Sequence, residues 1–140
     1  MFAQEDEVGL SDVRDINKLL PQLSRNAGKM TLARLKYLLE LDNFFIVDIR
    51  KDGHMVAMAT LLVKKTSMGS SGIIEDVVVD KKYRGRGLGE EVVRSAVRLA
   101  EVLALDHIEL TSRPSRKAAN KLYRKIGFKK RNTNCYRMNL

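Results

Sequence analysis

Apolar side chains recur every three to four positions in the first forty residues, the spacing of one buried helix face. In the first such segment these positions are Val13, Ile16, Leu19, Leu20 and Leu23. Ser11 or Asp12 is suited to cap the start of this helix. Thr31 opens a second, shorter pattern that continues to position 39. The sequence therefore predicts two N-terminal helices.

The next forty residues change to short apolar runs that are typical of β-strands. Residues 44–49 and 55–63 form two such runs, and the polar segment 51–54 between them predicts the turn of a hairpin. Residues 66–72 are polar and glycine-rich, which predicts a loop. Residues 73–79 are almost entirely apolar, and a strand of that kind is usually covered on both faces.

The remaining chain alternates between helical and strand patterns. A helical apolar stripe ends near residue 103, and a short strand is predicted at 107–111. A further helix, capped by Ser115, extends to about residue 126, and Gly127 follows where a positive φ is favoured.

A closing hairpin is predicted from Phe128 onward, around Asn132–Asn134. No internal repeat or linker interrupts the chain, so residues 1–140 are expected to form a single domain. The element order predicts an α/β fold with a mixed sheet, in which N-terminal helices precede a sheet flanked by helices.

Charge is concentrated at the C-terminal end. Residues 111–140 contain ten Lys and Arg and no acid, whereas residues 1–110 carry 16 basic and 17 acidic side chains. The excess of +9 over the whole chain therefore belongs to the last thirty residues. Such a footprint is typical of a module that binds nucleic acid or the ribosome.

Composition excludes several other classes. No apolar run approaches the ~20 residues that a bilayer requires, and the acidic first residues are unlike a signal peptide. Cys135 is the single cysteine, so neither an internal disulfide nor a cysteine-based metal cluster is expected. His54 and His107 are too few for a histidine-rich metal site. We expect a soluble, cytoplasmic protein without a metal or a membrane partner.

The strongest local motif is Arg84-Gly85-Arg86-Gly87-Leu88-Gly89, between a predicted strand and a predicted helix. Glycines allow positive φ and close approach of the backbone to a ligand, and the N–H groups of a helix start favour an anion. The motif lacks the Gly-Lys-Ser/Thr ending of a P-loop, and its glycine spacing and its distance from the strand do not match a dinucleotide fingerprint. A phosphate site of another kind is predicted.

Two motifs together resemble the GNAT superfamily of N-acetyltransferases. The first is the glycine turn with the strand Ile73–Val79 before it, and this strand and turn are similar to those of glucosamine-6-phosphate N-acetyltransferases. The second is Leu122-Tyr-Arg-Lys-Ile-Gly-Phe128. The resemblance covers about residues 44–140. It implies a splayed mixed sheet, acetyl-CoA as cosubstrate and transfer of the acetyl group to a primary amine.

The resemblance also implies a set of cofactor-binding residues. Backbone groups of the strand would bind the pantetheine arm, the glycine turn would bind the pyrophosphate, and the C-terminal helix would add further contacts. The residues concerned are Val77, Val79, Arg84, Arg86, Gly87, Leu88, Gly89, Glu90, Arg116 and Asn120. Arg116 stands where the family more often has an asparagine, and Asn120 is the substitute in this chain.

Three residues are candidates for the chemistry. Glu75 would act as the base that deprotonates the amine or would only shape the acceptor pocket, and both interpretations stay open. The Val78 backbone N–H would stabilise the tetrahedral oxyanion. Tyr123 would protonate the departing thiolate. Asp76 would point away from Glu75 in a regular strand, whereas a bulge would change that.

Two rival functions stay open at this point. One is the nucleic-acid or ribosome-binding module, although no zinc, KH or RNA-binding signature accompanies the basic residues. The other is a CoA-binding sensor without catalysis. The acceptor itself is not legible, although the two carboxylates favour a cationic amine, small or on a protein. Homodimerisation through the C-terminal strands is a further expectation from the resemblance.

Overall fold

The chain begins with two helices in the computed structural model, which describes residues 7–140. Helix α1 spans Leu10–Leu23 and helix α2 spans Leu32–Glu40, as the apolar spacing predicted. Thr31, which opens the second pattern, is the N-cap residue of α2, and its hydroxyl oxygen accepts the Arg34 N–H at 3.2 Å. The acidic residues 1–6 lie outside the described part of the chain.

The start of α1 differs from the prediction. The helix begins after Gly9, so neither Ser11 nor Asp12 is its cap residue. Asp12 lies one turn inside the helix and accepts the Gly9 N–H at 2.7 Å. A carboxylate in the first turn thus satisfies the helix start from within.

Four strands form one mixed sheet in the order β1-β2-β3-β4. Their bounds are Phe44–Lys51 for β1, His54–Thr66 for β2, Gly69–Val79 for β3 and Ile108–Glu109 for β4. β2 is antiparallel to both β1 and β3, whereas β4 is parallel to β3. The predicted hairpin of β1 and β2 is confirmed.

The predicted loop at residues 66–72 is wrong. Thr66 pairs with Gly69 and Val63 pairs with Gly72, so only the two residues between the strands form a turn. Main-chain ladder bonds do not depend on side-chain polarity, and this end of the hairpin extends past the core into solvent. Polar composition therefore indicated exposure, not irregular structure.

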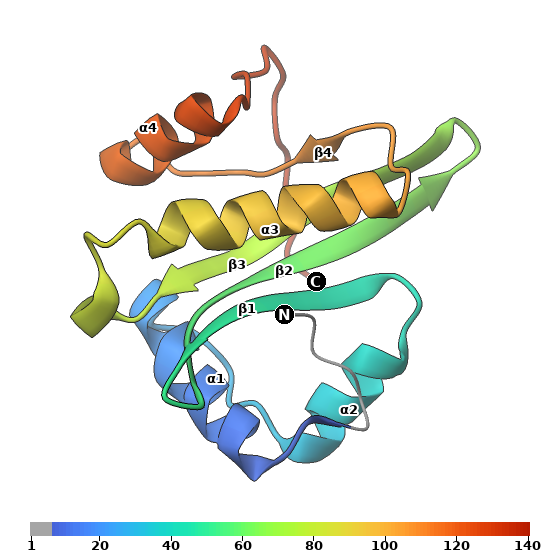
Figure 1. The fold of residues 1–140 in the computed structure, drawn as a ribbon. Coiled ribbons are helices and arrows are strands. Elements are labelled where there is room, and N and C mark those ends of the chain that lie inside the picture. The colour runs from blue at the N-terminus through green and yellow to red at the C-terminus, as the bar shows by residue number, and fades with distance from the viewer. Residues whose placement is uncertain (1–6) are drawn as a thin grey trace.

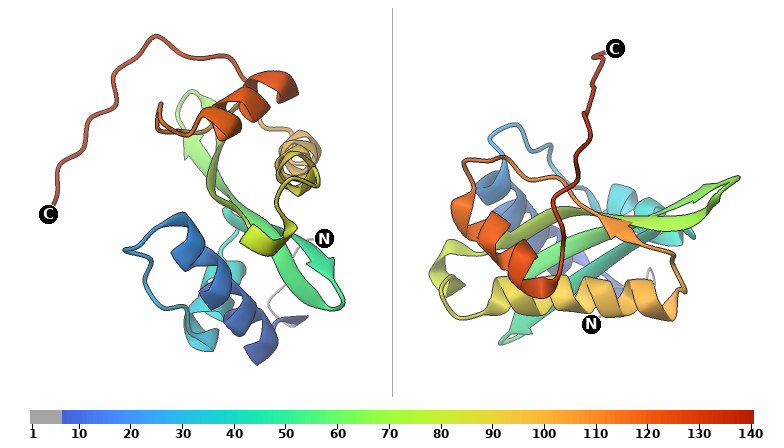
Figure 2. Two further views of the ribbon diagram at one scale, coloured as in Figure 1. Left: turned by 90° about the vertical axis from the view of Figure 1, so that its left-hand side faces the viewer. Right: turned by 90° about the horizontal axis from the view of Figure 1, so that it is seen from above.

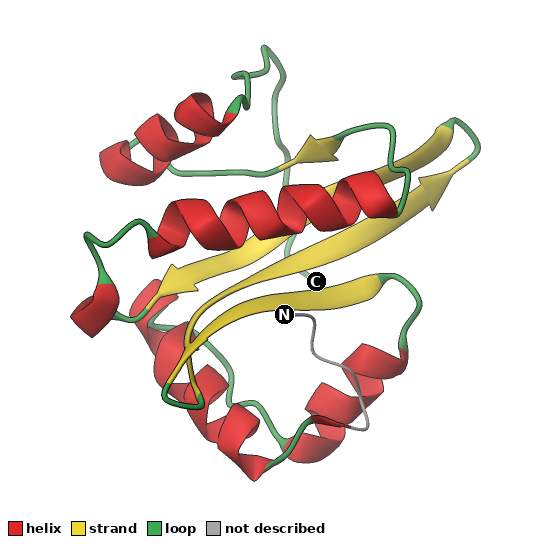
Figure 3. Ribbon diagram, in the orientation of Figure 1, coloured by secondary structure: helices red, strands yellow, loops and turns green. Residues whose placement is uncertain are grey.

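Helices cover both faces of the sheet, as Figures 1 and 2 show. Helix α3, Leu88–Val102, packs on one face through Val92, Val93 and Ala96, which are fully buried. The helices α1 and α2 cover the opposite face around Ile16, Leu19 and Leu35. The middle strand β2 is consequently buried on both sides. Figure 3 shows helix α4, Lys117–Ile126, beside α3.

A β-bulge reverses the faces of β3 part-way along the strand. Thr60 pairs with Glu75, but Met58 pairs with Val78, so one residue of β2 lies opposite two residues of β3. Asp76 has a φ of 52° at this point. Ile74 packs in the α3 core and Val78 in the α1 core, although residues four apart share a face in a regular strand.

The C-terminal predictions fail in two places. Helix α4 begins after Arg116 and not after Ser115, because Ser115 is held in a preceding turn by the Lys117 N–H, which donates to its carbonyl at 2.9 Å. Within the described chain, residues 128–140 contain no strand, so the closing hairpin is absent. This C-terminal tail runs out from the body of the molecule in Figure 2. Two strands without a third partner are marginal in water.

Candidate active site

The glycine turn and the start of α3 border a groove of about 440 Å³, which we call the cofactor groove. Its other walls are the end of β3 and one face of α4. Its lining includes Val77, Val78, Val79, Arg84, Gly87 and Tyr123. The predicted glycine turn therefore forms one wall of a groove that extends to α4.

Two glycines of the turn have backbone conformations that other residues rarely adopt. Gly85 has a φ of 74° and Gly87 a φ of 79°. A Cβ added at either position would meet no atom within 4 Å. Glycine is therefore favoured here by the positive φ and not by a lack of space. Gly87 is the N-cap residue of α3 and has no side chain to cap it.

The start of α3 leaves its first N–H groups without partners in the helix. The first helical bond runs from the Glu91 N–H to the Gly87 carbonyl at 3.0 Å, so Leu88, Gly89 and Glu90 precede the ladder. The N-cap residue, Gly87, makes no side-chain capping hydrogen bond. Free N–H groups and the helix dipole together favour an anion there.

The charged side chains of the turn have different environments. Arg84 Nε donates to the Val79 carbonyl at 3.0 Å and lines the cofactor groove. Arg86 lies over the Tyr83 ring, with its Cζ 5.4 Å from the ring centre. Glu90 bonds Lys125 at 2.6 Å and Arg94 at 3.0 Å, and these contacts lower the pKa of its carboxyl. Glu90 thus joins α3 to α4, and neither Arg86 nor Glu90 lines the groove.

The turn is anchored to α1 by a buried carboxylate. Asp80, only 1% exposed, pairs with Lys18 at 2.6 Å and accepts the Lys82 N–H at 3.1 Å. Gln22 accepts the Lys81 N–H at 2.8 Å beside it. The hydrogen bond from Lys18 is the main cause of the lowered pKa of Asp80. The N-terminal helix therefore fixes the position of the anion-binding turn.

A second cavity of about 790 Å³, which we call the acceptor pocket, opens on the other side of the β3 bulge. The strands β3 and β4 pair at only two positions, Gly72 with Ile108 and Ile73 with Glu109. Beyond them the two segments 74–77 and 110–113 both line the pocket. The splayed sheet of the prediction is present, and the splay forms the pocket.

The two cavities meet at the bulge. Four residues line both of them, namely Leu23, Val77, Arg116 and Tyr123. Glu75 and Asp76 line only the acceptor pocket, and the glycines of the turn line only the cofactor groove. Two molecules bound in the two cavities would therefore face each other beside Tyr123.

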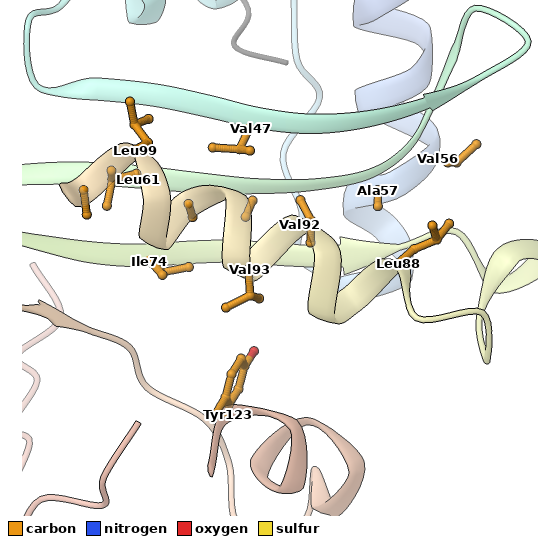
Figure 4. Close-up of a cluster of buried hydrophobic side chains, with 13 residues drawn as sticks. Val47, Val56, Ala57, Leu61, Ile74, Leu88, Val92, Val93, Leu99 and Tyr123 are labelled. Atoms are coloured by element: carbon orange, nitrogen blue, oxygen red, sulfur yellow. The ribbon is translucent and has the colours of Figure 1, made fainter. Parts of the chain in front are cut away.

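Tyr123 projects from α4 toward α3 and the sheet, as Figure 4 shows. Its side chain is 7% exposed and meets the Phe128 ring edge-on, with 6.0 Å between the ring centres. Burial raises the pKa of Tyr123 above 10.0, and the nearby charge of Arg116 opposes this only in part. The hydroxyl is consequently protonated, and able to donate, across the neutral range.

Two exposed carboxylates stand at the floor of the acceptor pocket. Asp76 accepts a long hydrogen bond of 3.4 Å from the buried Thr60 hydroxyl. Glu75 has no hydrogen bond or ion pair with any described residue. The bulge brings both carboxylates to one pocket, whereas a regular strand would have pointed them apart.

Asn120 has a structural contact instead of a place in either cavity lining. Its Nδ2 donates to the carbonyls of Arg113 and Arg116, both at 2.9 Å. The amide thus orders the loop before α4. Val78 pairs with Met58 of β2, and its side chain packs with residues of α1 and α2. Val77, Val78 and Val79 all border the groove.

The sequence prediction missed most of the acceptor pocket. Its lining includes the residues Leu23, Arg25, Ser112, Arg113 and Arg137. They come from the end of α1, the turn after it, the segment after β4 and the C-terminal tail, and no local motif marks them. The described residues contain no group of three or more acidic, histidine or cysteine side chains placed to hold a metal. No helix in that part of the chain is long and apolar enough to span a membrane.

The family of acetyltransferases named GNAT matches residues 10–128 of the chain. The chain belongs to the GNAT acetyltransferase family. It is 34% identical over 118 residues to glucosamine 6-phosphate N-acetyltransferase 1 of Oryza sativa subsp. japonica, a match that covers 80% of this chain and 68% of that protein. As a member of this family, the chain is an acetyltransferase. Enzymes of the GNAT family use acetyl-CoA as cosubstrate.

Solved structures share the same fold over the full GNAT domain. Glucosamine-6-phosphate N-acetyltransferase from Arabidopsis thaliana has a TM-score of 0.77 at 24% identity and covers 99% of this chain and 97% of its own. An aminoglycoside acetyltransferase from an uncultured soil metagenomic sample, solved with trehalose, has a TM-score of 0.87 at 15% identity. It covers 100% of this chain and 94% of its own. At these identities the structures establish the fold alone.

Proposed function

We propose that this GNAT enzyme transfers the acetyl group of acetyl-CoA directly to a primary amine that occupies the acceptor pocket. One observation carries the proposal: the cofactor groove and the acceptor pocket meet at the β3 bulge, and Tyr123 lines both. The names of the relatives give an amino sugar phosphate and aminoglycosides as their acceptors. Those names leave the acceptor of this chain to be found.

The residues around the cofactor groove fit acetyl-CoA, which supplies an activated thioester and several phosphate charges. The N–H groups at the start of α3, with Arg84 beside them, would hold the pyrophosphate. Backbone groups of Val77 and Val79, at the groove end of β3, would hold the pantetheine arm. Arg116 lines the groove as well and would meet the remaining negative charge.

Glu75 is the group proposed to accept a proton from the amine, directly or through a water. An ammonium has no lone pair, so the acceptor must be neutral before it can attack. Glu75 lies in the acceptor pocket without a competing partner among the described residues, which supports this role over Asp76 with its Thr60 contact.

The negative charge that develops during the attack is proposed to lie near the backbone of Val78. A backbone N–H aimed at an oxyanion needs no reorganisation during the reaction, which is the physical basis of such stabilisation. Tyr123 would then give its hydroxyl proton to the departing thiolate. Its raised pKa supports this direction, because the donor stays protonated until it is needed.

The proposal is tested by release of free thiol from acetyl-CoA across a panel of amines, with acetyl-CoA binding measured separately by calorimetry. We expect binding of acetyl-CoA and amine-dependent release of thiol. Binding without turnover of any amine would favour a sensor. Steeply salt-dependent binding to RNA, without acetyl-CoA binding, would overturn the proposal in favour of a nucleic-acid-binding module.

A further inference from the structure

Four arginines line the acceptor pocket without a counter-ion in the described chain. They come from three separate segments: Arg25 from the turn after α1, Arg113 and Arg116 from the loop before α4, and Arg137 from the C-terminal tail. Arg50 and Arg94 pair with carboxylates, whereas none of these four arginines does so in the described part of the chain. The pocket thus gathers positive charge that the described residues leave unneutralised.

These arginines are separate from the carboxylates of the same pocket. Glu75 and Asp76 both stand on β3 at the bulge, whereas the arginines stand on loops and on the tail. Arg25, Arg113 and Arg137 line the acceptor pocket and not the cofactor groove. Their charge therefore belongs to the acceptor side, and Arg116, which lines both cavities, is left to the cofactor.

A buried hydroxyl in the same pocket also lacks a partner. Ser112 lines the pocket directly beside Arg113, and its Oγ is buried without a hydrogen bond to any described residue. A buried polar atom of this kind costs stability unless something bonds it. A ligand oxygen in the pocket would satisfy the hydroxyl.

The loop that carries two of the arginines is ordered by the chain itself. The Asn120 amide donates to the carbonyls of Arg113 and Arg116, and the Arg116 N–H donates to the Arg113 carbonyl at 3.0 Å. These bonds fix the backbone before any ligand binds. Preorganisation of this kind lowers the entropic cost of binding.

We infer that the acceptor carries an anionic group, a phosphate or a carboxylate, in addition to its amine. Arg25, Arg113 and Arg137 bind that group together with the Ser112 hydroxyl, while the amine faces Glu75. Guanidinium groups match both anions through paired N–H donors. This inference rests on the proposed function for the role of the amine, but the anion site stands on its own residues.

Matched pairs of amines that differ in the anion test the inference. Glucosamine 6-phosphate against glucosamine forms the phosphate arm, and alanine against alaninamide forms the carboxylate arm. We expect kcat/KM to be at least about tenfold higher for the anionic member of one arm, which identifies the anion, since charged hydrogen bonds have roughly that effect. Equal or lower values for the anionic members in both arms would overturn the inference.

Variants locate the anion site. Arg113→Ala should remove most of the anionic advantage, about tenfold, and Arg113→Lys should restore part of it, because lysine keeps the charge but not the fork. Arg124→Ala removes an exposed charge of α4 that lines neither cavity, and it should keep the full advantage. An advantage that survives Arg113→Ala, Ser112→Ala and Arg137→Ala alike would contradict the site.

Direct binding separates this inference from the proposed function. Titration calorimetry with glucosamine 6-phosphate and alanine, in the presence of CoA, reports the anion site without turnover. Binding of either probe that Arg113→Ala weakens about tenfold supports the site even if no amine is acetylated. Turnover of amines that carry no anionic group, with no binding of either anionic probe, would reject the anion site and leave the proposed function standing.

Discussion

The cofactor groove and the acceptor pocket differ in the groups that form them. The groove depends on backbone: two glycines with positive φ and the free N–H groups of one helix start, all within residues 85–90. The pocket depends on side chains from α1, β3, the loop before α4 and the tail. Under the proposed function, the backbone site would bind the part that all acetyl-CoA users share, whereas a side-chain site is free to vary with the acceptor.

The residue at the boundary is expected to give the largest effect. Tyr123→Phe should lower kcat by at least about 10²-fold, the lower end of the range for general acid catalysis, and leave acetyl-CoA binding unchanged. Steady-state thiol release and calorimetry measure the two quantities. Tyr136→Phe is the matched control, because Tyr136 is 87% exposed and lines neither cavity. An undiminished kcat would remove the hydroxyl from the mechanism.

The raised pKa of Tyr123 makes the same assignment testable by pH. Burial raises the pKa of the Tyr123 hydroxyl above the ordinary value for tyrosine, about 10, so ionisation of this group should cause no loss of kcat that is centred below about pH 10. The measurement is kcat from pH 6 to 10. A loss centred near pH 8 that disappears in Tyr123→Phe would contradict the assignment.

On the acceptor side, Glu75→Gln should lower kcat/KM by about 10²-fold near neutral pH. The loss of kcat/KM should become smaller as pH rises, because more of the amine is then already deprotonated in solution. A pH profile of kcat/KM measures both trends. Glu109→Gln, an exposed change on the neighbouring strand β4, should have no effect. A defect of constant size at every pH would mean that Glu75 shapes the pocket and does not take the proton.

On the cofactor side, Gly87→Ala should weaken acetyl-CoA binding by about tenfold. A φ of 79° costs alanine roughly 1–2 kcal/mol, so the turn would shift toward a conformation that no longer presents its N–H groups. Calorimetric Kd values give the result. Gly28→Ala also meets open space but has no positive φ, and it should bind as the wild type does. Equal Kd values for both variants would contradict the backbone site.

The smallest expected effect concerns the anchor between the two regions. Asp80→Asn should lower the free energy of unfolding by about 1–3 kcal/mol at pH 7, because Lys18 and the turn lose a buried charged acceptor. The pKa of Asp80 is lowered in the fold, so its stabilisation is present above the unfolded value and is lost as pH falls through the folded one.

The difference between Asp80→Asn and the wild type should therefore shrink on acidification to about pH 3. Urea unfolding at the two pH values measures it. Asp52→Asn, in the exposed turn between β1 and β2, is the control and should be near neutral at both. If the difference in free energy of unfolding is as large at pH 3 as at pH 7, then packing and neutral hydrogen bonds anchor the turn, and the charge of Asp80 does not.

The sequence predicted what is local in this molecule. Residues 84–89 carry the glycine turn in one continuous motif, and the Tyr123 helix follows from its apolar spacing and the glycine at its end. The acceptor pocket was not predictable in this way. Its residues are brought together by the splay of β3 from β4, which depends on tertiary packing and not on any single segment.

The failed predictions have the same cause. Residues 66–72 looked like a loop because polarity reports exposure, yet the hairpin continues into solvent. Residues 128–140 looked like a hairpin around Asn132–Asn134, but they contain no strand in the described chain. The sequence left open whether the strand at Asp76 is regular or bulged, because the face to which each side chain points depends on pairing with the neighbouring strand.

The central claim is that both substrates meet in one complex beside Tyr123, with direct transfer between them. Initial rates measured over a grid of acetyl-CoA and the best amine of the panel test this most directly. Intersecting double-reciprocal lines are expected, together with no acetylated protein in mass spectra of the enzyme and acetyl-CoA alone. Parallel lines, with an acetyl group on the exposed Cys135, would contradict the account.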